Sequence, residues 1–439
     1  MPTINLRSQY LSAVIKNVRT FLHKRLGCGK SFLIFRKLVN VMVRLFHLQE
    51  LCLRLMGHNA VSKEASGEGG RGGRGGRRVL SFKHVVSLLL VASAQYPMVS
   101  YTIYNRDDME LVTACLSVVF TNMLTVIKII TFLVYKQDFW QMMQNFREMY
   151  SQSQSTDNKY VSKANKLACW LGRAYCISCC FTGLYFMLDP IVKFMLAKHR
   201  GVVYIRELPM PMKFPFNDAT SPGYEVAFAY TISVTIVVVC YASAVDGLFI
   251  SFAIHLRAHF QALQYAIRTT SYGNKDGRDL LGQEQEQQQH LLIAVVNYHV
   301  LLLSLANKLC LIYMPIVFGQ FVITSLQVGV IIYQIVTHMS SIMALLVYLS
   351  FLGSILLQLF IYCYGGEIIK VESVMVSVAV QLSDWHRAVP KQRRSLALIM
   401  LRAQHQALIK AGFYEASLAN FMAICRAALS FITLIQSIE

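Results

Sequence analysis

The chain has 439 residues, of which 55% are hydrophobic and only 15% are charged, and its net charge is +19. A soluble domain of this size does not need so much apolar surface, whereas apolar runs of about 20 residues match the hydrocarbon thickness of a bilayer. The composition therefore excludes an ordinary soluble globular protein. It predicts an all-α polytopic membrane protein with seven transmembrane helices.

The positive charge is concentrated before the first apolar run, in residues 1–78. This region contains 15 Lys and Arg against 3 acidic residues, and a basic segment beside a first span holds that end of a chain in the cytosol. Residues 32–56 alternate basic and apolar side chains, which predicts an amphipathic helix on the inner membrane surface. Residues 66–78 read SGEGGRGGRGGRR, a composition that predicts disorder. RGG triplets also occur in RNA-binding proteins, but two copies beside a hydrophobic span favour a flexible insertion, so no nucleic-acid partner is expected.

Seven apolar runs follow within one predicted membrane unit, residues 79–439. They cover residues 79–104, 111–135, 167–188, 226–254, 309–336, 342–364 and 417–437. The last run is the least hydrophobic. The Leu- and Ala-rich residues 394–412 are predicted to form one broken helix with it, interrupted near Ala411 and Gly412. A helix that is only partly apolar is shielded by protein or lines water, which sets the last span apart from the others.

The basic content of the loops sets the orientation. Three segments contain five Lys or Arg each, namely 136–166, 255–308 and 365–394. By contrast, residues 105–110 contain one Lys or Arg and residues 337–341 contain none. Loops rich and poor in basic residues therefore alternate along the chain, except for the proline-rich loop 197–223, which contains four. The pattern predicts an inner N-terminus and an outer C-terminus, opposite to a G-protein-coupled receptor.

The inner segments also carry apolar residues at helical spacing. Residues 255–308 and 365–412 are therefore predicted to extend the spans into a cytoplasmic helical bundle. Because the outer loops are mostly short, the mass of the chain should lie on the inner side, where partner subunits could dock.

Charged residues also fall inside predicted spans, where an isolated charge costs several kcal/mol. Arg173 lies near the inner start of the third span and is expected to extend to the inner interface. Lys128 is long enough to reach the inner interface, but Asp246 is too short for that. We therefore expect Asp246 to face the protein interior and to find a cationic or hydrogen-bonding partner, with Lys128 as a candidate. Arg426 lies in the middle of the last span and would repel cations from a pore, so we expect it to point toward other helices or a wet crevice.

Aromatic and hydroxyl side chains gather in the outer halves of four spans. They are Phe120, Thr121, Phe181, Tyr185, Tyr230, Thr231 and Tyr348. Facing one another, they could line an apolar pocket with a few polar groups, suited to a small, weakly polar molecule. The alternative is ordinary helix packing with an interfacial belt of tyrosines.

Motifs of catalysis and metal binding are missing from the sequence. We find no HExxH, P-loop, GxSxG or nucleotide-binding glycine motif, so the chain is not expected to be an enzyme or to hold a cofactor. The CxxC spacing of Cys176 and Cys179 lies inside an apolar run without a His partner, so no metal site is predicted.

The C-terminal part of the chain resembles a known family. From Trp385 it reads WHRAVPKQRRSLALIMLRAQHQALIKAGFYEASLANFMAICRAALSFITLIQS, similar to the C-terminal signature of insect odorant receptors. The residues that match are Arg402, Ala403, Gln404, Ala411, Gly412, Phe413, Ser417, Leu418, Phe421, Ser430, Thr433 and Gln436. The segment LCLRLMG at residues 51–57 is also similar, and the shared plan covers residues 46–439. The chain departs from the family at Gln406, where proline is usual, and at Arg426 and Ala428.

The resemblance implies an odorant-gated, non-selective cation channel in the plasma membrane of olfactory neurons. Such channels are tetramers in which a tuning subunit joins a shared co-receptor, and a small volatile apolar ligand binds in the outer half of the membrane. The final helices line the pore, which places Ser430, Thr433 and Gln436 in the pore and gate region. The short 255–308 segment and Thr433 are typical of a tuning subunit rather than the co-receptor.

Three other classes compete with this interpretation. A gustatory receptor shares the plan, but its last helix usually carries aromatic residues that TLIQS lacks. A G-protein-coupled receptor has the opposite orientation. A transporter would show paired broken spans or an internal repeat, and we find neither.

Overall fold

The structure, a computed structural model, describes residues 46–57, 82–155, 159–201, 208–218, 220–270, 282–338 and 342–438. Most of the predicted basic region, including the Gly/Arg tract, lies outside the described residues. Of the amphipathic helix expected at 32–56, only the last part is described, as α3 (His47–Leu55).

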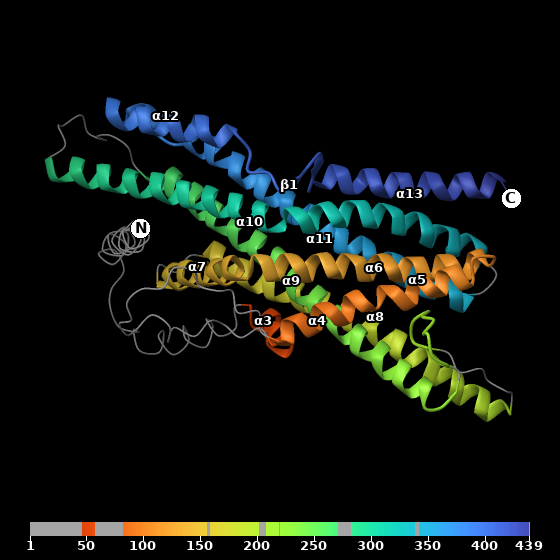
Figure 1. Cartoon of the computed structure of the whole chain (residues 1–439). Helices are drawn as coiled ribbons and strands as arrows, with labels where there is room; N and C mark the ends of the chain where they lie inside the picture. Colours follow the sequence, from red (N-terminus) through yellow and green to blue (C-terminus); the bar gives the residue numbers. More distant parts are fainter. Residues whose placement is uncertain are drawn as a thin grey trace, which may run out of the picture.

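Helices make up nearly all of the described chain (Figure 1). After α3 they are α4 (Phe82–Ser93), α5 (Gln95–Tyr104), α6 (Met109–Val134), α7 (Lys136–Ser155), α8 (Lys159–Arg200), α9 (Gly223–Thr269), α10 (Gly282–Thr337), α11 (Ile342–Gln381), α12 (Pro390–Gln404) and α13 (Leu418–Ile438). Six helical segments among the described residues are long and apolar enough to cross a membrane, and α13 adds a seventh apolar helix. The predicted all-α membrane fold with seven apolar helices is confirmed, while its orientation stays a prediction.

The first predicted span is divided between α4 and α5 at Ala94. Pro97 explains the division, because proline has no backbone N–H and its ring crowds the preceding turn of a helix. By contrast, α6 begins sharply. Its N-cap Asp108 accepts hydrogen bonds from the backbone N–H groups of Glu110 and Leu111 at 3.0 and 3.2 Å, which satisfies donors that a helix start leaves open.

Helices α8 to α11 are longer than a bilayer requires. The longest, α10, has 56 residues and at 1.5 Å per residue extends about 84 Å, against about 30 Å for the hydrocarbon layer. Helices α9, α10 and α11 thus continue without a break past the predicted spans. Together with α7 and α12 they project at one end of the molecule (Figure 1).

The interruption predicted near Ala411 and Gly412 is present, but the bounds of the helix predicted at 394–412 were wrong. Helix α12 begins earlier, with Pro390 in its first turn, where a missing N–H costs nothing, and it ends at Gln404. The break before the last span is a β-hairpin of β1 (Lys410–Ala411) and β2 (Tyr414–Glu415). Gly412 makes its turn with φ +62°, a conformation that disfavours any side chain.

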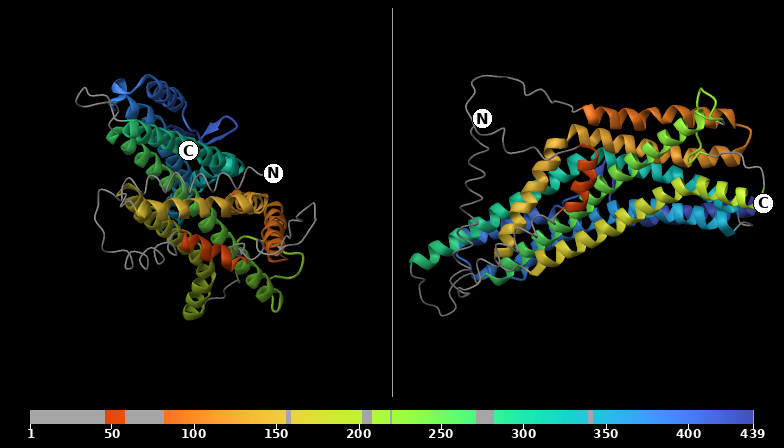
Figure 2. Two further views of the ribbon diagram at one scale, coloured as in Figure 1. Left: turned by 90° about the vertical axis from the view of Figure 1, so that its left-hand side faces the viewer. Right: turned by 90° about the horizontal axis from the view of Figure 1, so that it is seen from below.

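The core lies around α9, which crosses the bundle obliquely in the right-hand view of Figure 2. This helix packs against α3, α6, α8, α10 and α11. The ring of Phe249 on α9 meets that of Tyr313 edge-on and that of Tyr362 at a tilt, with ring centroids 4.9 and 4.7 Å apart. Because apolar residues surround α9 on nearly all sides, it is buried in a way that a one-faced amphipathic helix is not.

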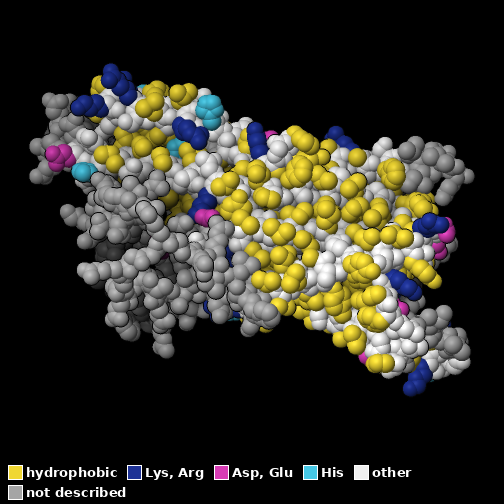
Figure 3. All heavy atoms as spheres, viewed as in Figure 1, with side chains coloured by type: hydrophobic (Ala, Val, Ile, Leu, Met, Phe, Trp, Pro, Cys, Tyr) yellow, Lys and Arg dark blue, Asp and Glu magenta, His cyan; other side chains and the backbone are white. Residues whose placement is uncertain are grey.

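Apolar side chains also cover much of the outside. In Figure 3 they spread over the middle of the visible face, and Lys and Arg side chains are seen mainly toward its two ends. Large exposed apolar residues such as Trp170, Phe181 and Leu326 belong to the apolar helices. This distribution is the reverse of a soluble protein's and matches a belt in contact with lipid.

Candidate functional site

A buried ion pair lies in the middle of the bundle. Nζ of Lys128 on α6 donates to Oδ2 of Asp246 on α9 at 2.7 Å, and the two side chains are 1% and 0% exposed. The hydroxyls of Tyr175 and Tyr362 donate to the same carboxylate, each at 2.5 Å. The expectation that Asp246 faces the interior with Lys128 as its partner is confirmed.

The hydrogen bonds continue from this ion pair to further helices. Nε2 of Gln358 on α11 donates to Asp246 Oδ2 at 2.8 Å, and Nε2 of Gln320 on α10 donates to Gln358 Oε1 at 3.2 Å. The network therefore joins α6, α8, α9, α10 and α11 at one level. A carboxylate with four donors is well compensated in a low-dielectric interior, so the network fixes how these helices register against one another.

A second apolar cluster lies toward the other end of the spans, beneath the loop 208–218. It contains Ala94, Met98, Cys115, Val118, Met210, Met212 and Val234. The loop is tied down by a hydrogen bond from Lys213 N to Pro97 O at 2.9 Å and by Cys115 Sγ, which donates to Pro211 O at 3.5 Å. We call this cluster and the loop over it the outer cluster, because the predicted orientation assigns this end of the spans to the outer side.

Two of the predicted pocket residues contact the outer cluster. The hydroxyl of Tyr230 lies 2.7 Å from Ser93 Oγ of α4, and its ring meets Phe214 of the loop edge-on at 5.7 Å. Thr231 is fully buried, and its hydroxyl donates to Ala227 O and lies 3.8 Å from Met212 Sδ.

Phe120 and Thr121 lie on α6 and are partly buried. Thr121 Oγ1 accepts a hydrogen bond from Gln327 Nε2 of α10 at 2.8 Å, and the same amide donates to Ser117 O at 3.0 Å. This pair of bonds joins α6, whose Cys115 and Val118 belong to the outer cluster, to α10.

The remaining three residues lie on α8 and α11. Phe181 is 69% exposed and Tyr185 is 37% exposed on α8. Tyr185 contacts Phe186, which in turn meets Phe351 of α11 edge-on. Tyr348, one turn from Phe351, lies beside the ring of His338 at 5.1 Å. Of the seven predicted residues, the structure therefore brings Tyr230 and Thr231 to the outer cluster, and Tyr185 and Tyr348 have other neighbours.

Met210, Met212 and Phe214 were not among the residues predicted from the sequence, although Met210 and Met212 belong to the outer cluster and Phe214 packs against it. The signal was present in the four prolines of the 197–223 loop, which was noted only because its charge broke the alternation. Prolines restrict the conformations of the unfolded loop, so less entropy is lost when the loop becomes ordered. Such a loop can pack in one conformation over the apolar cluster.

The start of α13 is held by α11 through several contacts. Glu367 Oε2 accepts from the Leu418 N–H at 3.2 Å, and Lys370 Nζ donates to Glu415 Oε1 at 2.8 Å. A carboxylate at a helix N-terminus is favourable, because it meets open N–H groups and the positive end of the helix dipole. Gly366 lies against the Ala416 carbonyl so closely that a Cβ there would approach its oxygen to 2.1 Å.

Along α13, Ser430 and Thr433 are exposed, and Thr433 Oγ1 donates to Ser430 O at 2.9 Å. Gln436 lies in the last turns of the same helix. Arg426 is also exposed, so no helix of the described chain buries it. Helix α13 packs against α10 and α11, which leaves its other side open.

Comparison with known proteins agrees with this architecture. The family model described as 7tm Odorant receptor matches residues 108–429. The chain is 60% identical to odorant receptor 82a of Drosophila melanogaster over 404 residues, which cover 91% of this chain and all of the relative. Odorant receptor 47a of the same species is 26% identical, covering 79% of this chain and 89% of the relative.

Among solved structures, the olfactory receptor OR5 from Machilis hrabei has the same fold. Its complex with eugenol matches with a TM-score of 0.69 at 15% identity, covering 91% of this chain and 100% of that one. The structure described without eugenol matches with a TM-score of 0.70 at 14% identity, covering 92% and 100%.

Proposed function

Since the chain belongs to the insect odorant receptor family, we propose that it is the odorant-binding tuning subunit of a heteromeric, ligand-gated, non-selective cation channel. The partner is the odorant co-receptor, and the final helices of the assembled subunits line the pore.

One observation carries the channel proposal. Helix α13 lies at the edge of the bundle (Figure 1), packed on α10 and α11 on one side and open on the other. Its exposed residues combine hydroxyls, at Ser430 and Thr433, with the large apolar residues Leu429 and Phe431. A single helix cannot enclose a pore, whereas several copies around an axis can form a narrow, partly apolar ring that blocks ions when closed.

The ligand enters this mechanism through the outer cluster. A small apolar molecule with one hydrogen-bonding group suits its methionines, its aromatic rings and the Tyr230 hydroxyl. Movement of α6 there reaches α10 through the Gln327 bonds, and α10 packs on α13. The ligand opens the pore only by binding the open arrangement more tightly than the closed one.

The subunit assignment is tested by recording odorant-evoked currents from cells that express this chain with the co-receptor, and from cells that express either one alone. We expect odorant-evoked current only when both are present. A robust odorant-gated current from this chain alone would contradict the tuning-subunit assignment.

The predicted orientation, with the N-terminus inside and the C-terminus outside, can be tested with epitope tags. With an inner N-terminus, an epitope tag added after Glu439 should be stained on intact cells, whereas a tag at the N-terminus should be stained only after permeabilisation. The reverse pattern would overturn the inside-out topology and favour a G-protein-coupled receptor arrangement.

Tyr230→Ala should weaken the response to any odorant that activates the channel. The variant removes the ring that contacts Phe214 and the hydroxyl that hydrogen-bonds to Ser93. Together these contacts stabilise the outer cluster by about 1–3 kcal/mol. We therefore expect the half-maximal odorant concentration to rise about tenfold or more in current recordings. The matched control is Tyr265→Ala, which removes a 56% exposed tyrosine from the inner part of the same helix and should leave that concentration unchanged. Equal shifts in both variants would argue against a ligand at the outer cluster.

A further inference from the structure

A cavity of about 630 Å³ lies between α3, α8 and α9, away from the outer cluster and from α13. It is lined by Phe46, His47, Leu48, Gln49, Asn165, Ala168, Cys169, Arg173, Ser251 and His255. The exposed side chains of His47 and Arg173 show that it opens to the outside. The cavity begins near the start of the third predicted span and ends near the end of the fourth, so it lies at one face of the membrane.

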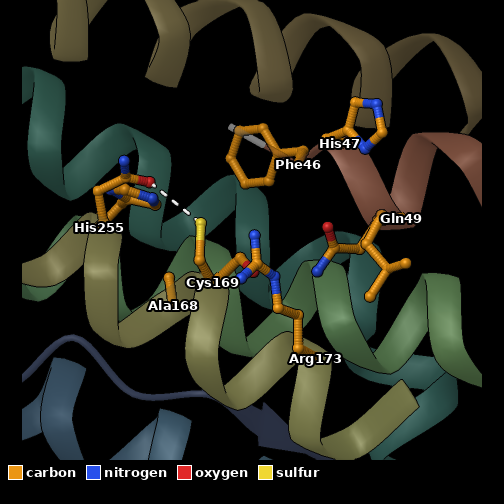
Figure 4. Close-up of a pocket in the computed structure, with 10 residues that line it drawn as sticks. Phe46, His47, Gln49, Ala168, Cys169, Arg173 and His255 are labelled. Carbon is orange, nitrogen blue, oxygen red and sulfur yellow. Dashed lines mark hydrogen bonds between the residues drawn. The ribbon is translucent and has the colours of Figure 1, made fainter. Parts of the chain in front are cut away.

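Arg173 gives this cavity its charge. In Figure 4 its side chain rises from α8 toward the space between Cys169 and Gln49. It has no hydrogen-bond or ion-pair partner among the residues that the structure places. The carboxylate closest in sequence to the lining residues, Glu50, already binds Arg147 and Arg54. A guanidinium inside the edge of an apolar span is costly without a counter-charge.

The lining of the cavity includes a buried polar atom without a partner in the described chain. His255 lines the cavity and is 1% exposed, and its Nδ1 has no hydrogen-bond partner in the described chain. Gln49 contributes a further amide, which donates weakly to Gly247 O at 3.4 Å. A buried ring nitrogen without a partner costs free energy, and a polar ligand in the cavity, or water held by it, would remove that cost.

The outside of α8 next to the cavity has the character of a membrane interface. Lys163 and Lys166 are exposed on the inner side of Arg173, and Trp170 is 65% exposed beside it. Farther into the span, Ile177 is 68% exposed. Basic residues, an interfacial tryptophan and then an apolar surface follow in the order in which a phospholipid presents its head group and its acyl chains.

We propose that this cavity binds the head group of an anionic phospholipid from the inner leaflet, with its phosphate on Arg173 and its acyl chains along the exposed face of α8. Bidentate binding of phosphate by a guanidinium is strong and directional. The proposal depends on the inner position of this end of α8 and is independent of channel activity. It implies that α3 is held against α8 and α9 partly through a lipid.

Native mass spectrometry of the purified full-length chain tests the site, with phosphatidylserine and phosphatidylcholine each titrated into the detergent micelle. We expect one phosphatidylserine per chain to be retained in preference to phosphatidylcholine. Arg173→Gln should weaken that retention about tenfold or more, because it removes a charged hydrogen bond, and Arg173→Lys should restore part of it. The control Arg200→Gln, at the opposite end of the same helix, should bind phosphatidylserine as the unmodified chain does.

Two further arms separate this lipid from other occupants. Cys169→Phe fills the cavity and leaves Arg173 in place, so it should also reduce phosphatidylserine retention. Undiminished retention in that variant or in Arg173→Gln would overturn the proposal. Inorganic phosphate that binds with the same dependence on Arg173, while phosphatidylserine does not bind, would identify a site for free anions and would equally overturn it.

Discussion

Asp246→Ala should destabilise the folded protein by about 3–5 kcal/mol, because it leaves the Lys128 ammonium buried without its partner. The same change removes the acceptor of the Tyr175 and Tyr362 hydroxyls and of the Gln358 amide. We expect a much lower yield of monodisperse protein and a large fall in Tm, measured by size-exclusion chromatography of heated, detergent-solubilised samples. Lys128→Met should be less harmful, because the Asp246 carboxylate keeps three hydrogen-bond donors.

The matched control for this pair is Lys193→Ala, which breaks the Lys193–Asp189 ion pair on α8. Those side chains are 48% and 33% exposed, and an exposed pair contributes at most about 1 kcal/mol. The double variant Lys128→Met/Asp246→Leu should recover much of the stability that Asp246→Ala loses, because no unpaired charge remains. Equal Tm values for Asp246→Ala and Lys193→Ala would show that the central pair does not hold the bundle together.

Gly366→Ala adds only a methyl group, but we expect it to abolish most of the odorant-evoked current. A Cβ at this position would lie 2.1 Å from Ala416 O and 2.8 Å from Ala416 Cβ, so α11 and the start of α13 must separate. Overpacking of this kind costs about 1–3 kcal/mol, and it acts where Glu367 holds the first turn of α13. We expect the current to fall at least tenfold at equal surface expression, measured by voltage clamp with the co-receptor present.

Gly353→Ala provides the comparison on the same helix. A Cβ there meets nothing within 4 Å, and replacing a helical glycine by alanine stabilises a helix by about 1 kcal/mol. Gly353→Ala should therefore keep its current and its Tm or raise the Tm slightly. If Gly366→Ala also keeps full current, the contact between α11 and α13 does not control the pore.

Much of the membrane architecture could be predicted from the sequence because hydrophobicity acts locally. Seven apolar runs appear as apolar helices, and Asp246 could be placed inside because a short carboxylate cannot reach water from that depth. The ends of the helices were less accurate. Helix α8 continues to Arg200, well past the predicted end of its span at 188, because polar residues can continue a helix and only hydrophobicity limits a span.

The residues predicted to line one pocket are only partly brought together by the structure. Tyr230 and Thr231 contact the outer cluster, and Thr121 joins α6 to α10, whereas Phe181 and Tyr185 lie on an exposed face of α8. Periodicity indicates which residues share one helix face, but it does not indicate which helix that face meets. The loop residues Met212 and Phe214 depend on how a chain without helical periodicity folds back, and no local pattern contains that information.

The sequence by itself determined the all-α membrane fold, the family through its C-terminal signature and the need of Asp246 for a partner, because each depends on local hydrophobicity, residue order or the cost of a buried charge. Only the tertiary structure decided that a hydrogen-bond network centred on that carboxylate joins five helices, that a hairpin and Gly366 join α13 to α11, and that Arg173 faces a cavity rather than open lipid. These features depend on distances between segments far apart in the chain, such as Lys128 and Asp246, and such distances are set by the packing of whole helices.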